Sequence, residues 1–453
     1  MENVDIVVSG AGPAGCIFAL TIDEKFSVTI LEKKSKSELG PDWIDGFDRK
    51  LIEDYDIMKY VEKLADSFGQ RFYSPDGSAS IAAPLSERIE IDRKILAQNL
   101  ISALNEKPNI TFIEHATVKT ALITDNSVVG VQYEKDNQEH SINSKLVVDA
   151  TGHPAVLRKN LAEVFGFKKE IEKIDTFLTF RKYIKRPTSL QTKEHKIFFG
   201  KDHGISWINS EMDDLVDLFA GVPNFSGHKN PKERVQELET QLKEECSSQI
   251  DLKPVRANYP GIIPTRRCLD SFCVNGFLLI GDSACQVEPL SGSGIASGML
   301  AANLAAKLVN NILQSGQKLT RANLWQYNHE WIQKIGAQHA SIDIFRLFLL
   351  SRTERDFNFL IRNRIITEND FKKSLKGEKV KLGLFELLRR LWRGWTRLGL
   401  LIALRTAIND ANKIKTAYLN YPKTYDKELF EQWQQKKEKI FKKYYNLAKK
   451  FNK

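Results

Sequence analysis

The chain has 453 residues, of which 67 are Lys or Arg and 57 are Asp or Glu, so its formal net charge is +10. A chain of this length is expected to bury a large core and to form two or three domains, and its hydrophobic content of 42% is ordinary for a soluble protein. We expect neither a signal peptide nor a transmembrane helix, because no run approaches ~20 uncharged apolar residues. Five scattered cysteines predict no disulfide, no metal site and a cytoplasmic location.

A glycine motif follows the first predicted strand. Residues 4–9 form a short apolar run bounded by glycine, as in a buried parallel strand. Gly10 permits a tight turn, Gly12 lets the backbone approach a pyrophosphate, and Gly15 lets the next helix pack close to the strand. In this context the spacing GxGxxG predicts a dinucleotide site.

The residues after the first glycines complete the predicted dinucleotide site. The following helix begins around Pro13 and Ala14, and the free N–H groups at its start point at the phosphates. A second apolar run at 28–31 ends in Glu32, about 20 residues beyond the glycines, where an acid accepts the ribose hydroxyls. Strand, turn, helix, strand and acid therefore occur in the expected order.

The middle of the chain predicts a second domain. Between residues 167 and 261, β-branched and aromatic runs are separated by Gly, Asp and Asn, as in an antiparallel sheet. Residues 230–250 form a charged amphipathic pattern with Val235, Leu238 and Leu242 on one side of a predicted helix.

A second glycine-rich segment lies at 276–309. Its apolar run at 277–280 predicts a buried strand, and Gly281 and Asp282 follow directly. An aspartate at this place can accept a hydrogen bond from a ribitol or ribose hydroxyl. Small residues at 291–294 offer free N–H groups where a long buried helix over 295–309 begins. We expect this segment to complete the site that Gly10 opens.

The segment GDSACQVEPLSGSGIASG resembles the GD segment of FAD-dependent oxidoreductases with the p-hydroxybenzoate hydroxylase fold. More narrowly, it resembles that of the geranylgeranyl reductases, and the segments at 89–104 and 146–159 agree. The resemblance covers roughly residues 1–330 and implies FAD as the cofactor. Besides Gly10, Gly12, Pro13, Ala14, Gly15 and Glu32, it nominates for FAD binding Arg93, Asp149, Gly152, Gly281, Asp282, Pro289, Gly292, Gly294 and Ile295.

Two residues near the predicted flavin allow more than one interpretation. Arg93 either lies near the flavin or pairs with Glu90 or Asp92 at the start of a helix. Glu288 is a candidate for proton delivery near the isoalloxazine ring, or a carboxylate that interacts with the dipole of the following helix. The sequence leaves both alternatives open.

The sequence departs from the family pattern in two places that concern the substrate. Many geranylgeranyl reductases have P-x-x-x-C-G after the first acid, whereas residues 39–50 contain no cysteine, so no thiol mechanism is transferred. The family signature Y-x-W-x-F-P is eroded near 198–210, where Trp207 remains without the proline. In this fold the antiparallel sheet covers the flavin, so Phe198 and Trp207 are candidates to line a prenyl pocket, with ordinary core positions as the alternative.

The basic charge is concentrated in the tail. Residues 381–453 contain 18 Lys or Arg and six Asp or Glu, a net formal charge of +12. Leucines and tryptophans at 384–405 fall at helical spacing with arginines on other faces, which suits a helix in a membrane interface, and docking on the protein's own core is the alternative. The last basic stretch, KKEKIFKKYYNLAKKFNK, is interpreted as a solvated or frayed helix. No nucleic-acid recognition module accompanies it, so we expect no nucleic-acid partner.

The resemblance implies an α/β protein (α+β overall) in three parts. Residues 1–166 and 262–330 form a Rossmann-like FAD-binding domain, with a small substrate-domain insertion near 60–88. Residues 167–261 form the antiparallel-sheet substrate domain, and 331–453 form a helical basic C-terminal region.

The function that the resemblance implies is FAD-dependent reduction of C=C bonds in the geranylgeranyl or isoprenoid chains of membrane lipids or their precursors. Reduced flavin gives a hydride from N5 to one alkene carbon, and a proton reaches the other. The electron donor stays open between NAD(P)H and a ferredoxin-like protein, and the expected partners are the lipid, a membrane surface and an electron-donor protein. One alternative is a monooxygenase of an aromatic or polyprenyl-quinone substrate, and another is a flavin-carrying binding protein without turnover.

Overall fold

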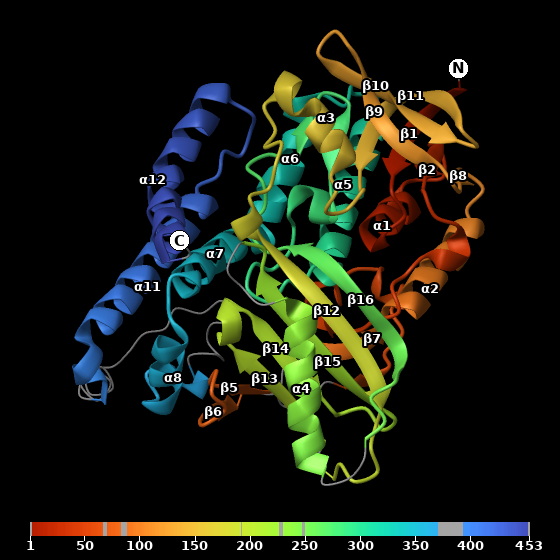
Figure 1. Cartoon of the computed structure of the whole chain (residues 1–453). Helices are drawn as coiled ribbons and strands as arrows, with labels where there is room; N and C mark the ends of the chain where they lie inside the picture. Colours follow the sequence, from red (N-terminus) through yellow and green to blue (C-terminus); the bar gives the residue numbers. More distant parts are fainter. Residues whose placement is uncertain are drawn as a thin grey trace.

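The computed structural model describes residues 2–66, 70–82, 88–191, 193–225, 230–246, 250–369 and 393–451 (Figure 1). It is a mixed α/β protein, which confirms the fold class predicted from the sequence. Two large sheets and one small sheet occupy the first two thirds of the chain, and the last third is helical (Figure 1).

The first large sheet carries both glycine-rich segments. Among the described residues it has eight strands, with the order β17-β18-β11-β1-β2-β8 and with β10 pairing with β11 and β9. These strands are β1 (Glu2–Ser9), β2 (Val28–Leu31), β8 (Ile110–Ile113), β9 (Thr117–Thr124), β10 (Ser127–Lys135), β11 (Gln138–Asp149), β17 (Cys273–Val274) and β18 (Phe277–Leu279). β1 runs parallel to β2 and β11, and β11 runs parallel to β18, so Ser9, Asp149 and Leu279 lie side by side. Two segments far apart in the sequence therefore start from one edge of one sheet.

Helices pack tightly around this edge. β1 is apolar and fully buried at Val7 and Val8, as expected for a parallel strand covered on both faces. α1 (Pro13–Thr21) packs against α5 (Ile295–Gln314), where Gly298 lies close to Gly281 and Ala14. The other helices of this layer are α2 (Arg93–Asn105), α3 (Val156–Phe165) and α6 (Arg321–Trp331).

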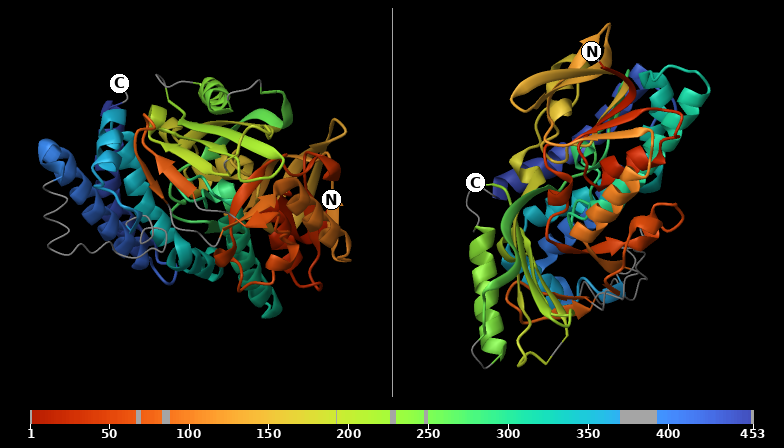
Figure 2. Two further views of the ribbon diagram at one scale, coloured as in Figure 1. Left: turned by 90° about the horizontal axis from the view of Figure 1, so that it is seen from below. Right: turned by 90° about the vertical axis from the view of Figure 1, so that its right-hand side faces the viewer.

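The second large sheet comes mostly from the middle of the chain. In the part that the structure describes, its order is β16-β12-β15-β14-β13-β5-β6. Its strands are β5 (Gln70–Tyr73), β6 (Ser80–Ala82), β12 (Thr176–Lys185), β13 (His195–Phe199), β14 (Ile205–Asn209), β15 (Leu215–Pro223) and β16 (Pro254–Pro264). α4 (Pro231–Cys246) covers one face through the predicted stripe of Val235, Leu238 and Leu242, as the right-hand view of Figure 2 shows. The opposite face is left for the interior of the molecule.

A small sheet connects the two large ones. It consists of β3 (Ile44–Asp48), β7 (Arg88–Asp92) and β4 (Ala65–Asp66), in the order β3-β7-β4. The Tyr183 hydroxyl of β12 accepts a hydrogen bond from the Ile44 N–H at 2.8 Å, which ties β3 to the second large sheet. β7 leads directly into α2, which belongs to the first.

The C-terminal helices are α7 (Ala337–Leu350), α8 (Glu354–Arg362), α11 (Leu398–Leu419) and α12 (Lys427–Phe451). The tail helix predicted at 384–405 lies in part outside the described residues, and this part includes Leu384, Leu387, Leu388, Leu391 and Trp392. α11 packs its later turns against α7 through Ala407, Ala411 and Ile414, and the two helices lie side by side in Figures 1 and 2. None of the helices in the described ranges combines the length and apolar character needed to cross a membrane.

The expectation that the last basic stretch is a solvated or frayed helix is wrong. It forms most of α12, in which Phe441, Tyr444 and Ala448 are buried at helical spacing. Lys442 and Lys443 between them are exposed, whereas Lys437, one turn before Phe441, is buried and pairs with Asp270 at 2.8 Å. The sequence conceals this docking face because lysines outnumber the apolar residues that form it.

The Asp270–Lys437 pair predicts an acid-dependent loss of stability. Burial acts to raise the pKa of Asp270, but the charge and hydrogen bond of Lys437 outweigh it and lower this pKa to about 2. The contribution of this carboxylate to stability is therefore complete above the unfolded-state pKa of ~3.9 and is lost as the pH falls toward 2, about 3 kcal/mol in all. We expect the Tm of the wild type to fall more steeply than that of Asp270→Asn between pH 4 and pH 2.5, and parallel curves would contradict this assignment.

Candidate active site

The three glycines of the N-terminal motif occupy three different environments. Gly10 has a φ of +103°, and a Cβ there would lie 2.4 Å from the Ala150 carbonyl oxygen. A Cβ at Gly15 would lie 2.1 Å from the Gly10 carbonyl oxygen, so α1 can approach β1 only with glycine here. A Cβ at Gly12 would meet no atom within 4 Å. Gly12 is thus not required by the packing of the chain itself, and the space beside it suits a pyrophosphate.

Glu32 lies where the motif requires an acid. It follows β2, is buried, and accepts a hydrogen bond from the Ala11 N–H at 2.8 Å and from the Lys34 N–H at 3.1 Å. Gly12, Pro13 and Ala14 line the adjoining cavity at the start of α1. These positions fit the ribose and phosphates of a dinucleotide as the sequence predicts.

The turn after β11 places two of the predicted FAD-binding residues differently: Gly152 lines the cavity, and Asp149 is buried beneath the turn. Gly152 has a φ of +74° and lines the cavity. The Asp149 carboxylate is fully buried, accepting hydrogen bonds from the Thr151 N–H at 3.0 Å and the Arg158 N–H at 2.8 Å. The expectation that Asp149 contacts FAD is therefore corrected. Its carboxylate oxygens accept hydrogen bonds from backbone N–H groups, so the side chain stabilises the turn that carries Gly152.

The GD segment brings Asp282 to the cavity. Gly281 has a φ of +66°, and Asp282 follows it at the end of β18. Burial raises the pKa of the Asp282 carboxyl, and the charge of Arg93 opposes this in part. Arg93 itself pairs with Asp45 at 3.3 Å, and neither of the sequence alternatives, Glu90 or Asp92, is its partner. Arg93 and Asp282 both line the cavity, although they are far apart in the sequence.

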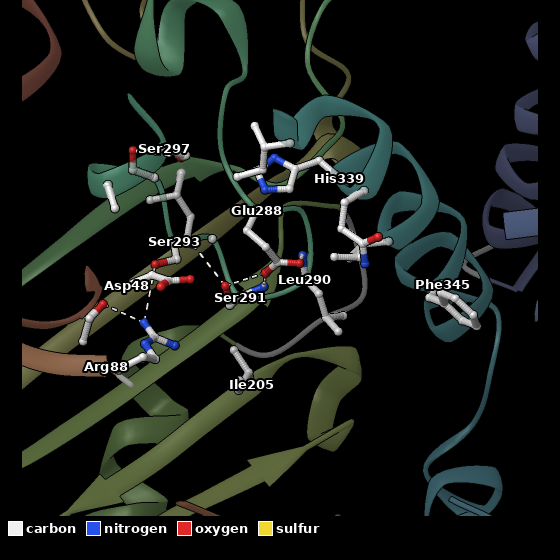
Figure 3. Close-up of a pocket in the computed structure, with 18 of the residues that line it drawn as sticks. Asp48, Arg88, Ile205, Glu288, Leu290, Ser291, Ser293, Ser297, His339 and Phe345 are labelled. Atoms are coloured by element: carbon white, nitrogen blue, oxygen red, sulfur yellow. Dashed lines mark hydrogen bonds between the residues drawn. The ribbon is translucent and has the colours of Figure 1, made fainter. Parts of the chain in front are cut away.

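The turn between Glu288 and Ile295 closes the far end of the predicted flavin site. The Glu288 carboxylate accepts hydrogen bonds from the Leu290 N–H at 3.2 Å and the Ser291 N–H at 2.6 Å, so it holds its own turn (Figure 3). Gly292 has a φ of +73°, and Gly294 is the residue before α5. Gly292, Gly294 and Ile295 line the cavity, whereas Pro289 is absent from its described lining.

One cavity of about 1480 Å³ joins Gly12, Arg93, Gly152, Asp282 and Gly292 to the second large sheet and to α7 and α11. Its described lining does not include Gly10, Gly15, Glu32 or Asp149. Trp207 lines this cavity, together with Ile197, Phe199 and Ile205. Phe198 lies on the opposite face of β13, in the core that α4 covers, so the expectation that it lines the pocket is wrong. Side chains alternate along a strand, and a shift of one residue exchanges the two faces.

Inside the cavity, a buried ion-pair cluster surrounds Arg181. Arg181 pairs with Asp217 at 2.7 Å and also with Asp45, and its guanidinium lies 5.5 Å from the ring centre of Trp207. Burial alone raises the pKa of Asp45, but the charges of Arg181 and Arg93 outweigh it and hold this pKa below its usual value. The Trp207 indole N–H donates to Asp217 at 2.8 Å. Sequence reasoning missed this cluster, because no spacing rule relates β3, β12 and β15.

The described residues contain no group of three or more His, Cys, Asp or Glu side chains suited to a metal ion. All five cysteines are unpaired and buried, and none of them lines the cavity. Within residues 39–50 the cavity is lined by Trp43, Asp45, Gly46, Asp48 and Lys50, and the Asp45 carboxylate is in ion pairs.

Comparisons with known proteins agree with this geometry. The FAD dependent oxidoreductase family matches residues 5–213. The digeranylgeranylglycerophospholipid reductase of Sulfolobus acidocaldarius is 24% identical over 430 residues, covering 93% of this chain and 94% of that protein. Digeranylgeranylglycerophospholipid reductase 1 of Methanococcoides burtonii is 25% identical over 388 residues, covering 82% of this chain and 90% of that protein.

Solved structures give the same fold. A geranylgeranyl bacteriochlorophyll reductase-like protein from Thermoplasma acidophilum superposes with a TM-score of 0.69 at 15% identity, covering 90% of this chain and 100% of that one. A flavin-dependent brominase superposes with a TM-score of 0.59 at 19% identity, covering 82% of this chain and 93% of that one. At such identities the likeness shows the fold alone.

Proposed function

We propose that this chain, which is similar over most of its length to digeranylgeranylglycerophospholipid reductases, is an FAD-dependent oxidoreductase that saturates C=C bonds in the geranylgeranyl chains of a membrane lipid or its precursor. FAD is the cofactor, and the residues around Gly12, Glu32 and Asp282 fit it. When bound and reduced, FAD supplies the hydride. The remaining tasks belong to the chain, which must bind the lipid, hold one alkene at a fixed place, exclude water and provide a proton.

The observation that carries this proposal is the apolar extension of the cavity beyond the predicted flavin site. From the turn at 291–294 the cavity passes Ile205 of the second sheet and reaches Phe345 of α7 (Figure 3). Its volume of about 1480 Å³ exceeds the roughly 300–1,000 Å³ of most ligand pockets, which leaves room for an extended chain beside a dinucleotide. Its distant part is lined by Phe345, Phe348, Leu349, Leu360, Leu398, Leu401, Ile402, Leu404 and Ile408.

Rigid aromatic side chains can hold the alkene in one place. Trp207 stacks on Phe219 with ring centres 3.9 Å apart, and its N–H is engaged by Asp217. Both rings line the cavity where the second sheet faces the small one. Aromatic side chains held in fixed rotamers in this way orient an apolar chain and keep water from it. This favours hydride transfer to one particular carbon of the alkene.

The test uses the full chain loaded with FAD and does not depend on the identity of the electron donor, whether NAD(P)H or a ferredoxin-like protein. After anaerobic photoreduction, a geranylgeranyl glycerophospholipid is added, and flavin absorbance and lipid mass are followed. We expect the flavin to reoxidise as the lipid gains two hydrogen atoms for each double bond lost. A requirement for O₂ with a product that gains one oxygen would identify a monooxygenase instead. Binding of the lipid without reoxidation would identify a binding protein.

We also propose that the mouth of this cavity meets a membrane surface. At the start of α11, Trp395, Leu398 and Ile402 are exposed by 68%, 50% and 66%. Leu398 and Ile402 also line the cavity, and Arg405 lines it one turn further along α11. Exposed apolar side chains beside a basic one suit the boundary between acyl chains and anionic headgroups, and a lipid chain can enter the cavity there.

Replacing Trp395, Leu398 and Ile402 together by serine should weaken binding to anionic liposomes. Each exposed apolar side chain contributes roughly 1.5 kcal/mol or more when buried in lipid, so the partition coefficient should fall at least about 100-fold. Sedimentation with liposomes measures it. The matched control replaces three other exposed apolar residues, Val164, Val255 and Leu429, by serine. Unchanged sedimentation of the first variant, or an equal loss in the control, would contradict the proposal.

A further inference from the structure

Glu90 is a buried carboxyl group in the cavity that no described residue engages. It lies on β7, is 7% exposed and lines the cavity. Among the described residues, no side chain or backbone N–H donates a hydrogen bond to it. A carboxyl group with this burial usually has a partner, because an unpaired charge in an apolar environment is costly. Burial without a hydrogen-bonding partner therefore favours the neutral form of Glu90 in the resting protein.

The neighbouring cations are held by other groups. Arg88 donates to the Gly46 carbonyl oxygen and lies 3.5 Å from the Ser293 hydroxyl (Figure 3). Arg181 is engaged by Asp45 and Asp217. Both arginines are close enough to act on the charge of Glu90, yet neither forms an ion pair with it. Glu90 thus stands beside two cations that would stabilise its carboxylate if it lost a proton.

The position of Glu90 relates it to the predicted flavin ring. Arg88 and Glu90 are two residues apart on β7, so their side chains lie on the same face, about 7 Å apart along the strand. Arg88 reaches Ser293 in the turn before α5, where the ring is expected. Across the small sheet Glu90 pairs with Gly46, which has no side chain to cover it.

Of the other acidic groups that line the cavity, Asp45, Asp217 and Glu288 are less suited to giving a proton, whereas Asp282 shares with Glu90 a pKa that burial raises. Asp45 and Asp217 are in ion pairs with Arg181, and the Glu288 carboxylate is used by its own turn. His195 lines the same region, but burial lowers its pKa to about 3, so it carries no proton to give at neutral pH. By contrast, burial raises the pKa of Glu90, although Arg88 and Arg181 oppose this in part. A carboxylic acid kept neutral in a dry site can act as a general acid.

We propose that Glu90 is the proton donor of the alkene reduction, an inference that rests on the proposed function. One alkene carbon forms a C–H bond with the hydride supplied by reduced FAD, and the other forms a C–H bond with the proton from the Glu90 O–H. Two electrons pass from the flavin to the alkene, and the C=C π bond is lost. Glu90 is left as a carboxylate beside Arg88 and Arg181, and it recovers a proton from water before the next turnover.

The kinetic test compares Glu90→Gln with the wild type after anaerobic photoreduction. We expect reoxidation by a geranylgeranyl glycerophospholipid to slow at least about 100-fold, the usual contribution of general acid catalysis. Retention of FAD and reoxidation by O₂ should stay unchanged. Glu90→Asp should keep part of the rate, and Glu62→Gln, the same change at an exposed residue, should keep all of it. An unchanged rate in Glu90→Gln, or a greater loss in Glu288→Gln, would overturn the assignment.

Two further measurements separate proton transfer from a structural role. The wild-type rate should fall as the pH rises through the pKa of Glu90, whereas the residual rate of Glu90→Gln should not show this dependence. In the infrared spectrum of the protein without added lipid, the carboxylic-acid C=O band at neutral pH should be weaker in Glu90→Gln, and an identical band would overturn the proposal. If the wild type itself is not reoxidised by the lipid, the proposed function fails, and this infrared result still tells whether Glu90 is protonated.

Discussion

A Gly12→Ala variant should fold as the wild type does and fail to retain FAD. A Cβ at this position meets no atom of the chain within 4 Å, so the apoprotein has no reason to rearrange. The same methyl group would occupy the space expected for the pyrophosphate, and overpacking of this size costs about 1–3 kcal/mol, or about 10- to 100-fold in Kd. Titration of the apoprotein with FAD, followed by flavin fluorescence, measures this loss, and the Tm of the apoprotein should change little.

The other glycines give the contrast that makes this result informative. Gly15→Ala should lower the Tm of the apoprotein, because its Cβ would lie 2.1 Å from the Gly10 carbonyl oxygen. Gly399 lies on α11, where an added methyl group would also meet no atom within 4 Å. Gly399→Ala should therefore leave FAD binding intact. Wild-type affinity for FAD in Gly12→Ala would show that the phosphates do not approach this backbone.

An Arg346→Met variant should be strongly destabilised. Arg346 on α7 is 2% exposed, pairing with Asp343 and Asp175 at 2.8 Å each and donating to the Ile174 carbonyl oxygen at 2.7 Å. Its removal leaves two buried carboxylates with fewer partners, and breaking such a pair usually costs about 3–5 kcal/mol. The Tyr445 hydroxyl of α12 also donates to Asp175, so the loss should loosen α7 and α12 together. Denaturant unfolding gives the free energy of unfolding directly.

Arg362→Met is the matched control for Arg346→Met. Arg362 on α8 also pairs with an aspartate, Asp76, but its side chain is 52% exposed. An exposed pair of this kind contributes no more than about 1 kcal/mol, because water solvates both charges when the pair is broken. Equal losses in the two variants would mean that burial does not determine the strength of the Arg346 pairs.

The dinucleotide site was predictable because it depends on short-range rules. Gly10, Gly12, Gly15 and Glu32 are governed by the turn, the helix start and the second strand, all within one β-α-β unit. The prediction that Asp282 lies near these residues required only the rule that parallel strands end at a shared edge of the sheet. Asp149 was misassigned, since its carboxylate serves the turn that it precedes, and the motif does not distinguish these two roles.

The substrate side was less predictable. Phe198 and Phe199 are both aromatic neighbours on β13, and which of them faces the cavity depends on the pairing register of that strand. Arg181 finds its partners Asp45 and Asp217 through contacts between three strands of distant sequence. In α12, the buried residues are recognisable as a face only once α7 and α11 are in place.

The sequence by itself predicted a dinucleotide site, because a nucleotide-binding turn is encoded by glycines at fixed spacing and by one acid, and its GD segment predicted FAD and the resemblance to geranylgeranyl reductases. Only the tertiary structure decided which side chains face the cavity, how far it extends and that Glu90 stands in it without a described partner. The physical reason is that local backbone geometry follows from neighbouring residues, whereas burial and charge pairing follow from surfaces brought together across hundreds of residues.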